Sequence, residues 1–152
     1  MARHSVWQPL EMQLEKRILV VDDDDAIRAL VLTVLRRRGH DVDAARNGVE
    51  AMQMITTQRY ALVVLDLMMP RMSGYDVMHA LARVSIMSRP RVLVLTAGHQ
   101  PRVLDTDLVV GTIHKPFDIE LLLDIVAGCL AAGPEPAIDP PEVSPAVTSR
   151  PN

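Results

Sequence analysis

Short apolar runs alternate with segments of helical periodicity along most of this chain. Runs of a few Val, Ile and Leu residues are typical of buried strands. The predicted strands are residues 17–21, 40–45, 60–65, 91–95 and 109–114. The first segment between them has the apolar spacing of an amphipathic helix, at Ile27, Leu30, Val31, Val34 and Leu35. A strand–helix unit repeated five times predicts an α/β domain, a doubly wound parallel sheet with right-handed crossovers.

Polar residues and glycines mark where the predicted helices begin and end. Asp24 can cap the first helix, and Gly39 suits the position just after its last turn. Asn47 and Gly48 form a predicted turn before a helix over 49–57. Asp118 is a good N-cap for the last helix.

The two ends of the chain differ in composition from the middle. Residues 1–16 show no sustained periodicity and are predicted to be a flexible N-terminal extension. Residues 133–152 hold six of the eleven prolines, with Ser, Thr and acidic residues, and are predicted to be a disordered tail. The folded domain is therefore predicted to cover residues 17–132.

Composition narrows the class of protein. At 152 residues the chain suits one domain with a core of its own. Sixteen basic and nineteen acidic side chains give a net charge of −3, which argues against a nucleic-acid-binding surface. Cys129 is the only cysteine, so no intrachain disulfide can form, and a reducing compartment fits.

No segment predicts export or membrane insertion. The amino terminus lacks the apolar stretch of a signal peptide. The longest apolar run, residues 121–132, contains Asp124 and is too short to cross a bilayer. We therefore expect a cytoplasmic protein with neither nucleic acid nor membrane among its partners.

Four of the predicted strands run directly into residues that carry chemistry. The first leads into Asp22 and Asp23, the third into Asp66, the fourth into Thr96 and the fifth into Lys115. In an open parallel sheet the carboxyl ends of the strands border the ligand crevice, so one edge should gather these side chains. Asp66 follows the pattern of a buried strand, and an ionised Asp in such a place needs a partner.

Carboxylates gathered at one edge repel one another, and a divalent cation removes that repulsion. Two unit charges ~4 Å apart cost about 4 kcal/mol at an effective dielectric of about 20. An all-oxygen site that keeps several waters suits Mg²⁺, which is the expected cofactor. With Lys115 on the other side and a hydrogen bond from Thr96, the charge of a phosphoryl group could be balanced. Asp66 is then the natural nucleophile, because carboxylates form aspartyl-phosphate intermediates.

Five motifs, in order and at strand ends, closely resemble the receiver domain of two-component response regulators. They are Val20-Val-Asp-Asp23, Asp66-Leu-Met-Met-Pro70, Gly74, Leu95-Thr-Ala97 and Lys115-Pro-Phe117. The resemblance covers about residues 17–132. It implies a flavodoxin-like fold, a five-stranded parallel sheet of order 2-1-3-4-5.

The resemblance also implies a role for each residue of the site. Asp66 would be the phosphoacceptor, Thr96 the switch hydroxyl and Lys115 the partner of the phosphate. The implied metal site is made of the acidic pair Asp22 and Asp23, the Asp66 carboxylate and the main-chain carbonyl of Met68. Asp23 and Asp66 would bind Mg²⁺ directly.

The sequence departs from the family pattern in two places. Most members carry Tyr or Phe three residues before the lysine, where this chain has Thr112. The segment 97–108 is short, so the fourth helix is expected to be shortened. Both departures affect how the signal would be read out and leave the phosphorylation chemistry intact.

We therefore expect a stand-alone receiver that takes a phosphoryl group from a sensor histidine kinase or a histidine phosphotransfer protein. It would act through protein–protein contacts. It would not be a conventional enzyme, although it would catalyse its own phosphorylation and slow dephosphorylation. The short segment after the last predicted helix cannot hold a helix-turn-helix, so no direct DNA binding is expected.

Two alternatives remain open at this point. A haloacid-dehalogenase-like phosphatase also uses an Asp nucleophile, Mg²⁺, Thr and Lys in an α/β sheet. Its nucleophile would follow the first strand, and the run 22–26 lacks the Thr or Val that such enzymes place after the second Asp. The other alternative is a degenerate receiver that serves only as a docking module, against which the acidic pair and Lys115 argue.

Overall fold

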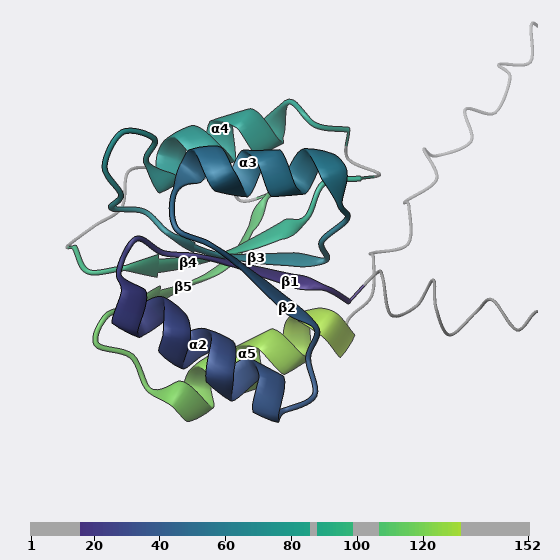
Figure 1. Ribbon diagram of the computed structural model, residues 1–152. Coiled ribbons are helices and arrows are strands. Elements are labelled where there is room, and N and C mark those ends of the chain that lie inside the picture. Colours follow the sequence, from purple (N-terminus) through teal and green to yellow (C-terminus); the bar gives the residue numbers. More distant parts are fainter. Residues whose placement is uncertain (1–15, 86–87, 99–106, 132–152) are drawn as a thin grey trace, which may run out of the picture.

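The computed structural model describes residues 16–85, 88–98 and 107–131, which form one sheet with helices on both faces (Figure 1). Among these residues no helix is long and apolar enough to span a membrane. Three predictions concern other residues. The N-terminal extension, the proline-rich tail and the shortened fourth helix within 97–108 lie wholly or mostly outside the described ranges.

Five strands form the sheet, and all of them run parallel. The strands are β1 Ile18–Val21, β2 Val42–Ala45, β3 Leu62–Asp66, β4 Arg91–Thr96 and β5 Val109–His114. Their order across the sheet is β2-β1-β3-β4-β5, which confirms the predicted flavodoxin-like arrangement. In the register, Asp66 lies opposite Leu95 and Thr96 lies opposite His114, so these strand ends share one edge.

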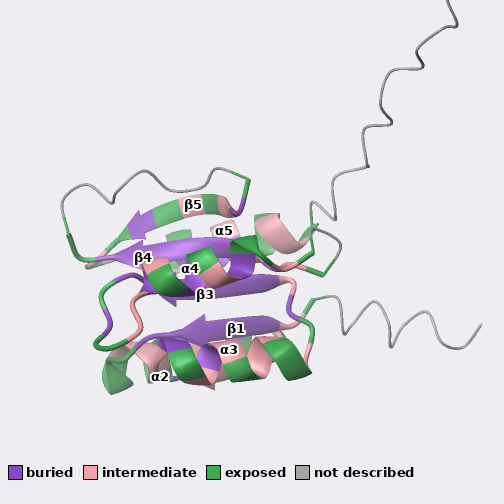
Figure 2. Cartoon of the chain, turned by 90° about the horizontal axis from the view of Figure 1, so that it is seen from above, coloured by how far each residue is buried: buried purple, intermediate pink, exposed green. Residues whose placement is uncertain are grey.

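The middle of the sheet is buried on both faces. Every residue of β1 and β3 is buried, as is every residue of β4 after Arg91 (Figure 2). Helices cover both faces of a parallel sheet, so its central strands become continuous apolar runs rather than alternating ones. The edge strand β5 instead alternates between intermediate and exposed positions over most of its length.

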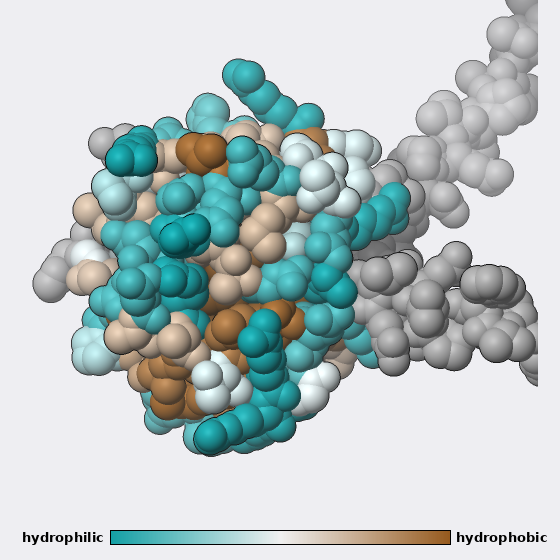
Figure 3. All heavy atoms as spheres, viewed as in Figure 1, coloured by the Kyte–Doolittle hydropathy of each residue, from teal (hydrophilic) through white to brown (hydrophobic). Residues whose placement is uncertain are grey.

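Two helices cover each face of the sheet. Helices α3 (Gly48–Thr57) and α4 (Gly74–Ala82) lie on one face, and α2 (Asp25–Arg37) and α5 (Ile119–Ala131) on the other (Figure 1). Each pair packs with its face of the sheet into a separate apolar core. The face of the molecule seen in Figure 3 is mainly hydrophilic, with smaller apolar areas between.

The predicted helix signals hold at most of the helix ends. The Asp24 carboxylate accepts hydrogen bonds from the N–H groups of Ala26 and Ile27, at 2.9 and 3.0 Å, as an N-cap does. Gly39 has a φ of +85°, the left-handed conformation that ends a helix. Asp118 accepts from the N–H of Glu120 at 2.8 Å.

Two local expectations need correction. Asn47 is the N-cap of α3, accepting from the Glu50 N–H at 2.8 Å, so the helix starts at Gly48 instead of after a turn. Leu30 belongs to the apolar stripe of α2 in sequence but is 42% exposed, whereas Val31 and Leu35 are fully buried. Val31 and Leu35 belong to the core that α2 shares with the sheet and α5, and Leu30 does not.

Candidate functional site

The predicted site residues meet at the carboxyl edge of the sheet, toward which the arrowheads of β4 and β5 point in Figure 1. Asp22 follows β1, Asp66 ends β3 and Thr96 ends β4. Lys115 follows β5, and its N–H donates to the Thr96 carbonyl at 2.7 Å, which continues the sheet pairing by one residue. Each side chain is therefore placed by the strand that precedes it.

Three carboxylates form an acidic cluster, which we define as Asp22, Asp23 and Asp66. One carboxylate oxygen from each lies within 4.8 Å of those of the other two. Asp22 is 0% and Asp66 3% exposed, whereas Asp23 lies at the surface. The cluster therefore opens to solvent on the side of Asp23.

Lys115 balances part of this negative charge. Its Nζ lies 2.9 Å from Asp22 Oδ2 and 3.5 Å from Asp66 Oδ2. Burial alone would lower the pKa of Lys115, but its hydrogen bond to Asp22 and the two carboxylate charges outweigh it and raise the pKa. The lysine is therefore held in its charged form between the two buried acids.

The charged form of Asp66 is less stable than that of an ordinary aspartate in water. Burial raises the pKa of Asp66 to about 6, and the charge of Asp22 and a hydrogen bond with Asp23 add to this rise. The Met68 N–H donates to Asp66 Oδ1 at 3.1 Å and, with Lys115, lowers the pKa in part. One lysine does not neutralise three carboxylates, so the cluster has the charge and the oxygen donors that suit a divalent cation.

The loop after β3 wraps closely around Asp66. A Cβ on Gly74 would lie 2.4 Å from the Asp66 carbonyl oxygen and 2.7 Å from the Leu67 Cα. Only a glycine lets α4 start this close to the strand end. Met68 is 67% exposed. Metal binding by its carbonyl remains a prediction.

The side chain of Thr96 is buried at the end of β4, next to Gly98. Thr96 is 3% exposed, and its Oγ1 accepts from the Gly98 N–H at 3.3 Å. Thr112, where the family usually has an aromatic residue, lies exposed in β5 opposite Val94. A short side chain at the surface cannot fill a buried space.

Sequence reasoning missed Arg28, which touches the backbone of the site. Its Nη1 donates to the main-chain carbonyl of Asp22 at 2.9 Å, and its Nη2 pairs with Asp25. Only the spacing of Asp25 and Arg28 on one helix face signals the pair in the sequence. The contact with the carbonyl depends on the path of the loop, which the sequence does not display.

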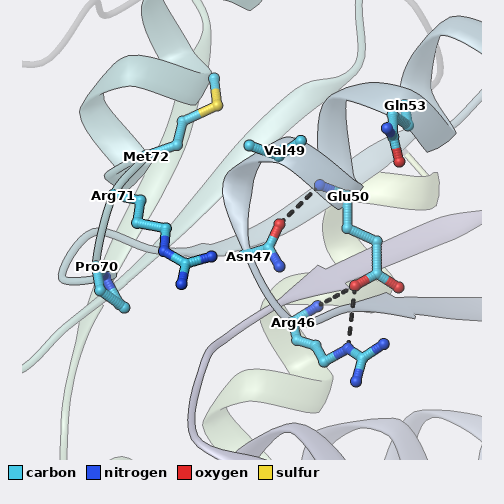
Figure 4. Close-up of a pocket in the computed structure, with 8 residues that line it drawn as sticks. All are labelled: Arg46, Asn47, Val49, Glu50, Gln53, Pro70, Arg71 and Met72. Carbon is cyan, nitrogen blue, oxygen red and sulfur yellow. Dashed lines mark hydrogen bonds and ion pairs between the residues drawn. The ribbon is translucent and has the colours of Figure 1, made fainter.

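A surface hollow of about 450 Å³ lies beside the site rather than on it (Figure 4). The start of α3 and the loop before α4 supply its lining residues: Arg46, Asn47, Val49, Glu50, Gln53, Pro70, Arg71 and Met72. None of the acidic cluster is among them, and Glu50 already pairs with Arg46 at 3.3 Å. The chemistry therefore resides in the acidic cluster rather than in this hollow.

Comparison with known proteins agrees with this geometry. The family model described as the response regulator receiver domain matches residues 18–127. A transcriptional regulatory protein CpxR homolog from Haemophilus influenzae is 38% identical over 115 residues, 73% of this chain and 49% of that protein. The sporulation initiation phosphotransferase F of Bacillus subtilis is 32% identical over 117 residues, 74% of this chain and 92% of that protein.

A solved structure shares the fold as well. The response regulator protein TrrA of Thermotoga maritima, in complex with Mg²⁺–BeF, has a TM-score of 0.66 and 33% identity, covering 75% of this chain and 98% of that chain. This chain spans about half the length of the CpxR homolog and nearly all of the sporulation protein. The chain belongs to the receiver domains of two-component response regulators, which have a phosphoacceptor role in signalling.

Proposed function

We propose that this receiver accepts a phosphoryl group on Asp66 from a phosphohistidine, carried by a sensor histidine kinase or a histidine phosphotransfer protein. The observation that carries the proposal is the place of Asp66: a nearly buried carboxylate, 3% exposed, with Lys115 Nζ 3.5 Å away. Phosphoryl transfer needs mainly positioning and charge balance. Lys115 places one positive charge beside this carboxylate, and the proposed Mg²⁺ would balance the remaining negative charge.

In the transfer step, an oxygen of the ionised Asp66 carboxylate forms a bond to phosphorus. The bond between phosphorus and the histidine nitrogen breaks, and the imidazole leaves and takes a proton from solvent. Lys115 pairs with the phosphoryl oxygens, and the Thr96 hydroxyl donates a hydrogen bond to one of them. Later attack of water on the same phosphorus releases inorganic phosphate and restores Asp66, so the protein limits the lifetime of its own signal.

We propose Mg²⁺ as the cofactor. Asp23 and Asp66 would hold it directly, with Asp22 and the Met68 carbonyl completing the protein side of the site. The ion would neutralise the acidic cluster and the incoming phosphoryl group. The spacing of the carboxylate oxygens, within 4.8 Å of one another, supports this fit, and the related TrrA was solved with Mg²⁺–BeF.

Intact-mass analysis tests the proposal. The wild-type protein is incubated with Mg²⁺ and a small phosphodonor, and separately with a phosphorylated histidine kinase. We expect one added phosphate in the wild type and in Asp124→Asn, an exposed control carboxylate, and none in Asp66→Asn. An unmodified wild type with every donor would contradict the proposal and favour the docking-module alternative.

Membership of the receiver family leaves no support for the haloacid-dehalogenase alternative. That reading would make Asp22 the nucleophile. Both oxygens of Asp22 are already engaged, because Oδ1 accepts from the Asp24 N–H and Oδ2 accepts from Lys115 Nζ, both at 2.9 Å. A carboxylate with both oxygens held in this way suits a fixed place beside the proposed metal better than attack on phosphorus.

A further inference from the structure

We propose that Arg28 is a positioning residue that sets the affinity of the site for Mg²⁺ by fixing the backbone of the loop that carries Asp22 and Asp23. The inference rests on the proposed Mg²⁺ site. It adds a residue outside that site whose side chain touches neither the expected ligand atoms nor the phosphoryl group.

The contacts of Arg28 run across the whole loop between β1 and α2. Its Nη1 donates to the Asp22 carbonyl at 2.9 Å, at the end of the strand, while Nη2 pairs with the Asp25 carboxylate at the start of the helix. The Arg28 side chain is only 18% exposed, whereas that of Asp25 is 87% exposed. The guanidinium therefore lies against the loop rather than extending into water as a surface pair would.

The rest of the loop is held by short-range bonds around Asp24. The Asp24 N–H donates to Asp22 Oδ1 at 2.9 Å, and the Arg28 N–H donates to the Asp24 carbonyl at 2.9 Å. Asp23 lies between these anchored residues and is the exposed member of the acidic cluster. The direction of its carboxylate is therefore set by a backbone that Arg28 holds from outside.

The position of Arg28 and its charge should change the affinity for Mg²⁺ in opposite directions, which makes the proposal testable. A cation near the acidic cluster repels Mg²⁺, so removing Arg28 should strengthen Mg²⁺ binding if charge alone matters. Mg²⁺ demands nearly ideal octahedral geometry, so a looser loop should weaken binding. Outer-shell partners of metal ligands commonly change metal affinity by about tenfold or more, so the loss of position should outweigh the gain in charge.

The simpler alternative is that Arg28 only forms an ordinary ion pair with Asp25 on the helix surface. Such i, i+3 pairs stabilise a helix slightly and have no particular effect on a nearby metal site. The contact with the Asp22 carbonyl is what this alternative does not require. The two hypotheses predict different Mg²⁺ affinities once Arg28 is replaced, but not different melting temperatures.

The experiment is a calorimetric titration with Mg²⁺ alone on the full chain, for wild type, Arg28→Met and Arg28→Lys. Arg37→Met is the matched control, since it removes the same charge from the exposed far end of α2. We expect Arg28→Met to bind Mg²⁺ about tenfold more weakly than wild type. We expect Arg28→Lys, which keeps the charge but not the planar fork, to bind more weakly as well, and Arg37→Met to bind as wild type does.

A second readout separates loop geometry from global stability. In chelator, the Asp24 amide should exchange hydrogen faster in both Arg28 variants, while core amides of β3 keep their protection. Arg28→Met that binds Mg²⁺ as tightly as wild type, or more tightly, overturns the proposal. Arg28→Lys at wild-type affinity overturns the role of the two-pronged contact. A wild type that binds no Mg²⁺ overturns the proposed metal site itself. That outcome is seen with the wild-type protein alone, so it is distinct from a failure of the proposal about Arg28.

Discussion

Asp23 is the member of the acidic cluster whose charge is most easily removed without leaving a hole in the core, since it lies at the surface. Asp23→Asn keeps the shape of the side chain but ends one like-charge repulsion. We expect the free energy of unfolding in chelator to rise by about 0.5 kcal/mol, on the scale of exposed charge pairs, and Mg²⁺ affinity to fall. Thermal melts with and without Mg²⁺ check both. An Asp23→Asn protein less stable than wild type in chelator would show that repulsion does not dominate.

Gly74 shows how closely the loop must pack against the phosphoacceptor. In Gly74→Ala the new Cβ would lie 2.4 Å from the Asp66 carbonyl oxygen, a backbone atom that has little freedom to move away. We expect a loss of about 1–3 kcal/mol in the free energy of unfolding, together with slower phosphorylation because Asp66 is displaced.

Gly128→Ala is the matched control for that substitution. A Cβ there meets nothing within 4 Å, and the residue lies inside α5. Alanine forms helices better than glycine, so this variant should gain up to about 1 kcal/mol. Urea unfolding of both proteins gives the comparison, and a stable, normally phosphorylated Gly74→Ala would refute the packing argument.

At the scale of elements, the sequence predicts those parts of the fold whose burial produces a local pattern of apolar residues. β1, β3 and β4 are continuous apolar runs because helices cover both faces, and each was predicted to within two residues. The strand order has no such local signal, and the family resemblance supplied it. The bond from Arg28 and the exposure of Leu30 depend on how α2 packs, which no periodicity reports.

β5 carries Thr112 at the place where most members of the family have an aromatic residue. In receivers that carry an aromatic residue at the place of Thr112, the ring moves when the hydroxyl matching Thr96 moves. Thr112 is exposed and too small to do this. We therefore expect phosphorylation to act by ordering the loops after Asp66 and Thr96, and expect Thr112→Ala to respond as wild type does.

Hydrogen exchange of the free and phosphorylated proteins measures this response. Protection should rise in the loops that follow β3 and β4, to the same extent in wild type and Thr112→Ala. A Thr112→Ala protein that is phosphorylated but gains no protection would make the threonine itself the switch.

At the scale of the whole molecule, the site couples metal binding to stability through the protonation of one group. Burial raises the pKa of Asp66 to about 6, whereas an unfolded Asp has a pKa of about 3.9. As pH rises from about 4 to about 6, the unfolded chain therefore loses this proton before the folded protein does. In that window the folded state holds more of this proton than the unfolded state does, so the contribution of Asp66 to the free energy of unfolding falls as pH rises and levels off above about pH 6.

This sign gives a prediction for the metal-free protein. In chelator, the difference in unfolding free energy between Asp66→Asn and wild type should grow from about pH 4 to about pH 6, because the variant lacks the titrating group. Asp124→Asn should run parallel to wild type. Mg²⁺ binds the ionised carboxylate, so saturating Mg²⁺ should stabilise wild type much more at pH 7 than at pH 4.5. Urea unfolding across this pH range checks both statements. A constant difference between Asp66→Asn and wild type would mean that Asp66 ionises as readily in the folded protein as in the unfolded chain, and that Lys115 alone balances the acidic cluster.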